Sequence, residues 1–256
     1  MEKTRVVITG ATSGLGQEMA RQLAQRGWRV AITGRREDKL KEVEQVVRSA
    51  GGEPLALAGP VNDLEAVKRH YAAIKEKWGG LDWAVLNAGV GEAMNAKQFS
   101  ADKVRWVFET NIFGAANWME AVIPDMIRAG SGMIAAVSSL ASFRGLPRSG
   151  PYCASKSALN TLLESARVDL RGTGVDVVTI CPGYVKSELT ARHADVSMPF
   201  LLETEDGVRR MLRGIDARRR IVHFPWQLSY AMKYAIARLP GWLYDRIASP
   251  FAVSNR

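Results

Sequence analysis

Short apolar runs alternate with longer segments of helical periodicity along most of the chain. A continuous apolar run of this length is typical of a strand buried on both faces. Strands that alternate with helices predict a parallel sheet with right-handed crossovers. We expect strands at 4–9, 28–33, 54–58, 81–86, 133–137, 175–180 and 221–224, and helices at 17–26, 37–50, 67–78, 102–126 and 151–171. The fold class is therefore α/β, a doubly wound Rossmann fold with a mostly parallel sheet of about seven strands and helices on both faces.

Length and composition are those of one large domain spanning residues 1–256, with 47% hydrophobic residues to form its core. The two cysteines imply no disulfide framework and fit a reducing compartment. No run reaches the ~18 uncharged apolar residues that a membrane-spanning helix needs, and the first strand begins too early for a signal peptide. We predict a cytoplasmic protein. The histidines have no metal-ligand spacing, so we predict no metal site.

Glycines follow the first predicted strand at positions 10, 14 and 16, and a helix follows them. Glycines permit a tight turn and close approach of the backbone, and a helix N-terminus attracts a pyrophosphate. The spacing differs from the better-known Gly-x-Gly-x-x-Gly. Because a strand and a helix flank these glycines, we predict a dinucleotide site, with a plain glycine turn as the alternative.

The second predicted strand ends in Gly34-Arg35-Arg36. An acid at this position would accept the 2′-hydroxyl of NAD, whereas a base would pair with the 2′-phosphate of NADP. Two arginines and no acid predict that NADP(H) is favoured over NAD(H). The alternative is a solvated basic start of the next helix.

Tyr152 and Lys156 lie four residues apart in a predicted helix, so their side chains share one face. A nearby ammonium favours the phenolate and lowers the tyrosine pKa from about 10. General acid–base catalysis needs a group whose pKa lies near the working pH. The pair alone is common by chance, and a surface tyrosine and lysine are the alternative.

Six motifs occur together in one order and spacing: Thr9-Gly10-x3-Gly14-x-Gly16, Asn87-Ala88-Gly89, Asn111, Ser139, Tyr152-x3-Lys156 and Pro182-Gly183. This set resembles the short-chain dehydrogenase/reductase family over residues 4 to about 190. The resemblance implies transfer of a hydride between nicotinamide and a carbonyl carbon, with a homodimer or homotetramer as the assembly.

The resemblance also implies catalytic roles. Tyr152 would be the acid/base, Lys156 would lower its pKa and hold the nicotinamide ribose, and Ser139 would orient the substrate. Asn111 would hold a relay water behind the lysine. Ser138 precedes Ser139, and the choice between them rests on spacing. The implied cofactor contacts are Gly10, Thr12, Ser13, Gly14, Leu15, Gly16, Arg35, Arg36, Val61, Asn87, Ala88, Gly89, Tyr152, Lys156, Pro182, Gly183, Val185 and Ser187.

One position departs from the family pattern. Where the family has an aspartate as an adenine contact, this chain reads Pro60-Val61-Asn62-Asp63. Val61 still offers backbone groups to the adenine, whereas Asp63 is displaced and is predicted to cap the next helix.

Three variable loops, 90–100, 140–151 and a lid at about 184–206, should determine the substrate. They carry many large apolar side chains, which predicts an apolar carbonyl substrate; the alternative is that these side chains pack the loops onto their own domain. The apolar set is Met94, Phe99, Phe143, Leu146, Tyr184, Met198, Phe200, Leu201 and Leu202.

The net charge of +9 is concentrated at the end of the chain, because ten basic and two acidic residues follow Asp206. The last segment, about 225–256, is predicted to form a basic amphipathic extension. Four of its apolar residues recur at helical spacing: Leu228, Met232, Ala235 and Leu239. Such an extension can lie on an anionic membrane as a peripheral contact, or pack on its own domain or a partner subunit. No nucleic-acid-reading motif accompanies the arginines, so we predict no nucleic-acid binding.

The sequence thus predicts an NADP(H)-dependent oxidoreductase that interconverts a carbonyl and an alcohol. An NAD-preferring alcohol dehydrogenase is one alternative. A non-catalytic NADP-sensing protein is the other, although the complete Tyr-Lys-Ser-Asn set argues against it.

Overall fold

A computed structural model describes residues 3–191 and 198–252. Its strands are β1 (Arg5–Thr9), β2 (Arg29–Gly34), β3 (Glu53–Ala58), β4 (Trp83–Leu86), β5 (Gly132–Val137), β6 (Val175–Pro182) and β7 (Ile221–Phe224). Its α-helices are α1 (Gly14–Ala24), α2 (Glu37–Ser49), α3 (Leu64–Trp78), α4 (Ala101–Phe108), α5 (Gly114–Ala129), α6 (Gly150–Asp169), α7 (Glu188–Ala191), α8 (Thr204–Asp216), α9 (Trp226–Tyr230) and α10 (Gly241–Ala248).

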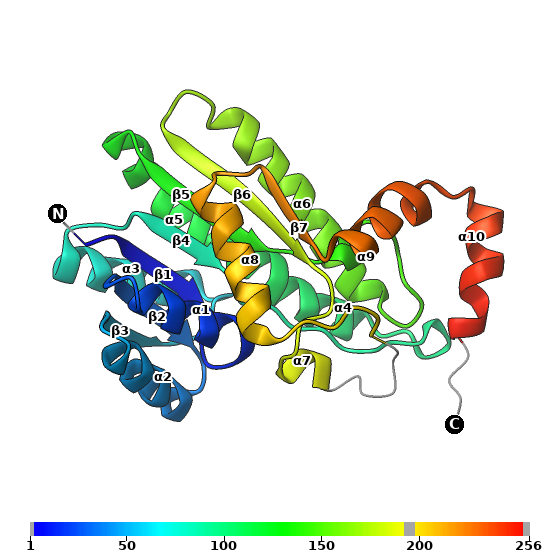
Figure 1. The fold of residues 1–256 in the computed structure, drawn as a ribbon, viewed down its shortest axis with the longest axis horizontal. Coiled ribbons are helices and arrows are strands. Elements are labelled where there is room, and N and C mark those ends of the chain that lie inside the picture. Colours follow the sequence, from blue (N-terminus) through cyan, green and yellow to red (C-terminus); the bar gives the residue numbers. More distant parts are fainter. Residues whose placement is uncertain (1–2, 192–197, 253–256) are drawn as a thin grey trace.

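All seven strands form one sheet in the order β3-β2-β1-β4-β5-β6-β7, as Figure 1 shows. Every neighbouring pair is parallel. The predicted doubly wound fold is therefore confirmed, and the sheet is parallel throughout rather than mostly parallel. The strand order reverses between β1 and β4, which is where open parallel sheets bind ligands.

The sheet is buried on both faces, which explains why its strands are apolar without alternation. On one face, α1, α2 and α8 contribute side chains such as Met19, Val43 and Met211 to one core cluster. On the other face, α3, α5 and α6 contribute Ile74, Trp118 and Leu159 to a second cluster. This packing fixes the carboxyl ends of the strands, where the predicted site lies.

The helix predicted over 102–126 is continuous but not regular. A π-helical segment, Glu109–Phe113, joins α4 to α5. Such bulges insert an extra residue into a helix and are frequent at functional sites. Here the bulge contains Asn111, which faces the interior and is 1% exposed.

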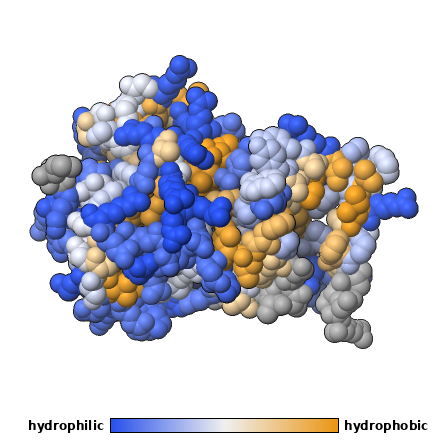
Figure 2. All heavy atoms as spheres, in the orientation of Figure 1, coloured by the Kyte–Doolittle hydropathy of each residue, from blue (hydrophilic) through white to orange (hydrophobic). Residues whose placement is uncertain are grey.

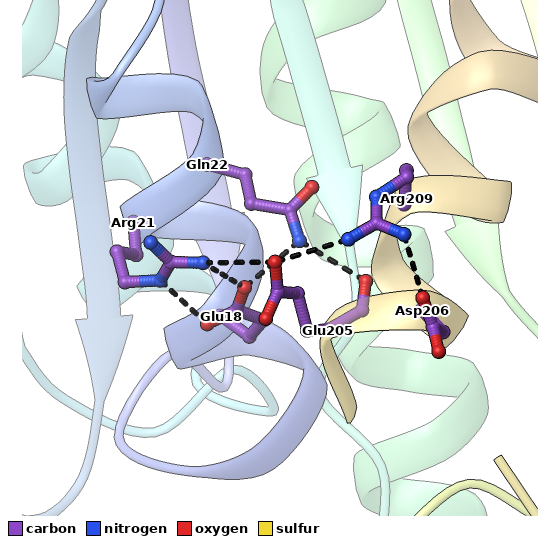
Figure 3. A network of polar contacts seen from close by, with 6 residues as sticks. All are labelled: Glu18, Arg21, Gln22, Glu205, Asp206 and Arg209. Atoms are coloured by element: carbon purple, nitrogen blue, oxygen red, sulfur yellow. Dashed lines mark hydrogen bonds and ion pairs between the residues drawn. The ribbon is translucent and has the colours of Figure 1, made fainter. Parts of the chain in front are cut away.

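The two ends of the predicted lid are joined by backbone contacts. Val185 and Leu202 form an isolated parallel bridge. The helix that follows the lid, α8, is tied to α1 by the polar network in Figure 3, in which Glu205 accepts from Gln22 through its carbonyl oxygen (3.1 Å) and pairs with Arg209 (3.0 Å). The lid therefore returns to a helix that is fixed against α1, the helix that follows the glycine turn. Residues 192–197 of the lid lie outside the described residues.

Candidate active site

A cleft of about 550 Å³ lies at the carboxyl ends of the strands. Of the predicted site residues, all but Gly16 and Asn111 line it. In the sheet, β1 and β2 lie on one side of β4, whereas β5 and β6 lie on its other side. The glycine turn after β1 and Arg35 and Arg36 after β2 therefore lie toward one end of the cleft. Ser139, which follows β5, and Pro182, the last residue of β6, lie toward the other end of the cleft.

The glycine turn is shaped so that backbone groups face the cleft. Gly10 and Gly14 have φ angles of +64° and +53°, which L side chains rarely adopt. Ser13 is the N-cap of α1 but makes no side-chain cap, so its side chain satisfies none of the first N–H groups of the helix. A Cβ on Gly16 would lie 2.5 Å from the carbonyl oxygen of Gly10, so Gly16 packs the helix on the turn from behind the cleft wall. This cradle fits a pyrophosphate.

Asn87 holds the cradle from the neighbouring strand. Its Nδ2 donates to the carbonyl oxygens of Thr9 (2.9 Å) and Gly10 (3.1 Å), and its backbone N–H donates to Oγ1 of Thr9 (3.0 Å). Ala88 donates its N–H to the same hydroxyl (3.0 Å). The motif Asn87-Ala88-Gly89 therefore fixes the end of β4 against the end of β1.

Arg36 lies across the mouth of the glycine turn. Its Nη2 donates to Oγ1 of Thr12 (2.9 Å) and to Oγ of Ser13 (3.1 Å), and its guanidinium pairs with Glu188 (3.2 Å). Arg35 also lines the cleft and is exposed. The structure thus gathers two guanidinium groups and two hydroxyl groups beside the end of β2, with one carboxylate opposite them.

Tyr152 and Ser139 meet at the other end of the cleft. The hydroxyl of Tyr152 hydrogen-bonds with the side chain of Ser139. Ser139 Oγ also accepts from the backbone N–H of Ala141 (3.1 Å). Ser138 Oγ instead donates to the carbonyl oxygen of Lys156 (3.1 Å) and is buried. The choice between the two serines, which spacing alone did not decide, therefore falls on Ser139, because only its side chain contacts Tyr152.

Lys156 is 3% exposed and reaches beneath the site. Its Nζ donates to the carbonyl oxygen of Val137 (2.7 Å) and lies 5.8 Å from the centroid of the Tyr152 ring. Because Tyr152 and Lys156 both belong to α6, the predicted one-turn spacing on a single helix is present.

Burial changes the pKa of both groups. It raises the pKa of Tyr152 to about 12, a rise that the hydrogen bond with Ser139 partly offsets. It lowers the pKa of Lys156 to about 8. The predicted lowering of the tyrosine pKa is therefore wrong for this arrangement, since burial, which disfavours the charged phenolate, is the largest influence on the pKa of Tyr152. The phenol is held in its protonated form at neutral pH.

Asn111 lies behind the cleft wall rather than on it. Its Oδ1 accepts from the N–H of Val90 (2.8 Å), and its Nδ2 donates to the carbonyl oxygen of Val90 (2.9 Å) and to Oγ of Ser155 (2.9 Å). A Cβ on Gly89 would lie 3.2 Å from Lys156 Nζ and 3.4 Å from Asn111 Oδ1. Asn111 thus fixes the loop that passes over the lysine.

The remaining predicted contacts have mixed surroundings. Val61 lines the cleft, although its carbonyl oxygen already accepts from Asn117 Nδ2 (3.0 Å). Asp63 caps α3 through Oδ1, which accepts from the N–H groups of Glu65 (2.9 Å) and Ala66 (3.1 Å), as predicted. Val185 is 3% exposed and packs largely in the core.

Thr190 was missed from the sequence, although it lines the cleft. Its Oγ1 accepts from the N–H of Ser187 (2.9 Å) and contacts the carbonyl oxygen of Val185 (3.0 Å). The signal that was available is its position, three residues after Ser187 at the start of a helix.

The apolar loop residues divide into two groups. Leu146, Tyr184 and Met198 line the cleft. Met94 is buried in its loop, Leu202 packs against the core, and Phe99 and Phe200 are exposed. Leu228 and Met232 of the extension also line the cleft, although only the three loops were expected to do so. The apolar wall is therefore built partly by the C-terminal extension.

Comparison with known proteins gives a consistent result. A family model described as short chain dehydrogenase matches residues 4–196. An uncharacterized oxidoreductase of Myxococcus xanthus (strain DK1622) is 45% identical over 250 residues, covering 97% of this chain and 97% of that protein. 11-beta-hydroxysteroid dehydrogenase 1A of Arabidopsis thaliana is 30% identical over 257 aligned positions, covering 93% of this chain and 73% of that protein. A short chain dehydrogenase/reductase of Burkholderia phymatum in complex with NAD superposes with a TM-score of 0.83 at 25% identity, covering 93% and 92% of the two chains.

Proposed function

The chain belongs to the short-chain dehydrogenase/reductase family, and on this premise we propose that it is an NADP(H)-dependent oxidoreductase that interconverts a carbonyl and an alcohol on an apolar substrate. The observation that carries the proposal is the cleft itself. It places a hydrogen-bonded Tyr152–Ser139 pair at one end and a glycine cradle with Arg35 and Arg36 at the other.

The chemistry follows from what these side chains can do. A bound nicotinamide supplies the hydride for the carbonyl carbon. Negative charge then develops on the carbonyl oxygen, and the hydroxyls of Ser139 and Tyr152 stabilise it by hydrogen bonding. Tyr152 donates its proton to that oxygen, so one hydride and one proton convert the carbonyl to an alcohol. Because burial raises its pKa to about 12, Tyr152 keeps its proton at neutral pH and is present in the form that donates it to the carbonyl oxygen.

The preference for NADP(H) is supported by the charges beside the glycine turn. Arg35 and Arg36 follow β2 and line the cleft, where a 2′-phosphate would accept charge-assisted hydrogen bonds. Arg36 is held by Thr12 and Ser13 and so is already directed at this position.

The rival is an NAD-preferring dehydrogenase. One argument for this alternative is the Burkholderia phymatum protein, whose structure contains NAD. The other is the ion pair between Glu188 and Arg36, because it neutralises one of the two arginines. If Glu188 holds Arg36 away from the cofactor, the charge that selects the phosphate is reduced.

A panel of apolar aldehydes and ketones, assayed with NADPH and with NADH, tests the function. We expect turnover with a lower KM for NADPH, and we expect Arg35→Asp to reverse the preference. A wild-type preference for NADH would contradict the cofactor assignment alone. Tight NADPH binding without turnover on any member of the panel would instead indicate a cofactor-sensing protein.

The substrate is a small molecule, and we further propose a homodimer or homotetramer. Apolar side chains of the helical segments from α4 to α6, including Phe113, Ile127 and Leu162, are exposed in the single chain. Sedimentation velocity measures the assembly directly, and a monomer at micromolar concentration would contradict it.

A further inference from the structure

The C-terminal extension, residues 225–252, lies outside the sheet beside β7. Figure 1 shows α9 and α10 projecting from that edge of the molecule. The segment in which apolar residues recur at helical spacing is not one regular helix: α9 is followed by a π-helical segment, Ala231–Ala235, and a 3-10 turn, Ile236–Arg238. None of the helices in the described ranges is long and apolar enough to traverse a bilayer.

The inner side of the extension belongs to the site. Leu228 and Met232 line the cleft, and Met232 packs with Leu140 and Cys181. Arg144, in the loop after β5, donates to the carbonyl oxygen of Ala237 (3.1 Å) and stacks 4.4 Å from the ring centroid of Tyr244. The apolar face predicted from helical spacing is thus turned largely toward the protein, so it is not free for another partner.

The outer side carries a different set of residues, which we call the aromatic stripe: Trp226, Tyr230 and Tyr234. These residues recur every four positions, and their ring centroids lie 6.5 Å and 5.2 Å apart. Trp226 is 66% exposed, and beyond the stripe Trp242 and Phe251 are 70% and 73% exposed. Figure 2 shows apolar surface continuing along the α10 region, in contrast to the hydrophilic surface over α1 and α2. An exposed set of this kind is unusual unless it meets a partner.

Cations accompany these aromatic residues. Lys233 and Arg238 each lie near the ring of Tyr234, at 5.3 Å and 5.5 Å from its centroid. Arg246 is exposed on α10, and Asp245 is the one acid between residues 225 and 256. A second copy docked on this surface by a two-fold axis would bring like charges together. An anionic lipid surface is complementary, because tryptophan and tyrosine favour the headgroup level and cations pair with the phosphates.

We propose that the aromatic stripe, together with Trp242 and Phe251, rests on an anionic phospholipid bilayer. The same extension forms the apolar wall of the cleft with its inner side, so this contact places the cleft beside the headgroups. A lipophilic carbonyl compound dissolved in the bilayer would then reach the cleft without crossing bulk water. The contact itself does not depend on the proposed reaction, so each can fail alone.

Cosedimentation of the full chain with vesicles tests the proposal. The vesicles are phosphatidylcholine alone or phosphatidylcholine mixed with phosphatidylglycerol, at low and at high salt. We expect binding to the anionic vesicles, weakened by salt. Removing two cations with Arg238→Gln and Arg246→Gln should lower the partition coefficient about 30-fold, at about fivefold for each charge near the surface. Trp242→Ala with Phe251→Ala should also lower it.

The matched control is Arg213→Gln with Arg219→Gln, two exposed arginines of α8 and the turn before β7. It gives the same change of net charge at another surface and should leave binding unchanged. If vesicle binding falls equally in the Arg238→Gln, Arg246→Gln variant and in this control, the effect is one of net charge and the proposal is overturned. An absence of binding to every vesicle would also overturn the proposal. If the full chain binds no vesicle and the Trp242→Ala, Phe251→Ala variant differs from it in sedimenting mass, a second copy is the occupant of this surface.

Discussion

The two ends of the cleft are built in different ways. At the cofactor end, the shape comes from backbone and short side chains: two glycines with positive φ, and Asn87, whose amide holds the turn by two hydrogen bonds. At the substrate end, the shape comes from apolar side chains of two loops, 140–151 and the lid, and of the C-terminal extension. At the cofactor end, an added methyl group would clash with the backbone, as at Gly16, whereas the apolar side chains of the substrate end can be replaced by others of similar size. Substitutions at the two ends should therefore fail differently.

The largest effect is expected at the substrate end, where Tyr152 lies. Tyr152→Phe removes the proton donor and keeps the ring, so the reductive kcat should fall about 10³-fold, within the range of general acid catalysis. NADPH affinity, measured by fluorescence titration, should change little. The neighbouring Cys153→Ser, at a buried position that faces no reacting group in the proposal, should keep most of the activity. Turnover left intact by Tyr152→Phe would remove the proposed acid.

A smaller effect on affinity is expected at the cofactor end. A Cβ on Gly16 would lie 2.5 Å from the Gly10 carbonyl oxygen and 2.6 Å from Asn87 Nδ2, so Gly16→Ala must displace the turn. An overpacking cost of about 1–3 kcal/mol corresponds to about 5- to 150-fold weaker NADPH binding if the turn carries it. Gly241→Ala is the matched control, because Gly241 also lies in a first helical turn and its Cβ would meet nothing within 4 Å. Unchanged affinity in Gly16→Ala would show that the turn is pliable, against the comparison above.

The same contrast explains what could be predicted from the sequence. Strand positions, the parallel sheet and the glycine turn follow from local rules, since buried strands are apolar and a positive φ favours glycine. The Asp63 cap was predicted correctly because capping involves residues two and three positions away.

What could not be predicted depends on packing between distant segments. The sign of the Tyr152 pKa shift was wrong, because it is set mainly by burial of the phenol in the folded protein, which the spacing of two residues along a helix does not reveal. Periodicity located an apolar face on the extension but not that Leu228 and Met232 would turn toward the cleft. Asn111 was assigned to the site, yet its π-helical position directs its amide to Val90.

A third effect sets the alkaline limit. Burial lowers the pKa of Lys156 to about 8, so its ammonium is present below that pH and is lost above it. If the ammonium holds the cofactor, kcat/KM for NADPH, which reports the free enzyme, should fall about tenfold per pH unit above pH 8. Tyr152, with its pKa raised to about 12, stays protonated through this range. Lys156→Met should give a low but flat profile. A wild-type profile that is flat to about pH 10 would contradict the role of the charge.

The smallest effect tests whether the substrate end also contains a rigid part. The carbonyl oxygen of Ser139 accepts from Oγ of Ser142 (2.6 Å), and that hydroxyl accepts from Nδ2 of Asn160 (2.7 Å). Ser142 is therefore a positioning residue, which acts on the substrate through Ser139. Ser142→Ala should lower kcat about fivefold, the equivalent of one net hydrogen bond of about 1 kcal/mol, and leave KM for NADPH unchanged.

Loss of stability alone cannot separate this role from a structural one, since Ser142→Ala also leaves the half-buried Asn160 amide with one partner fewer. The separation comes from Ser142→Thr, which restores the hydroxyl and should restore kcat, and from Ser157→Ala, an exposed serine on α6 that should change nothing. If Ser142→Ala lowers the melting temperature but not kcat, Ser139 is positioned by the strand end alone. The substrate end would then be as fixed by its backbone as the cofactor end, and the contrast between them would rest on the apolar wall.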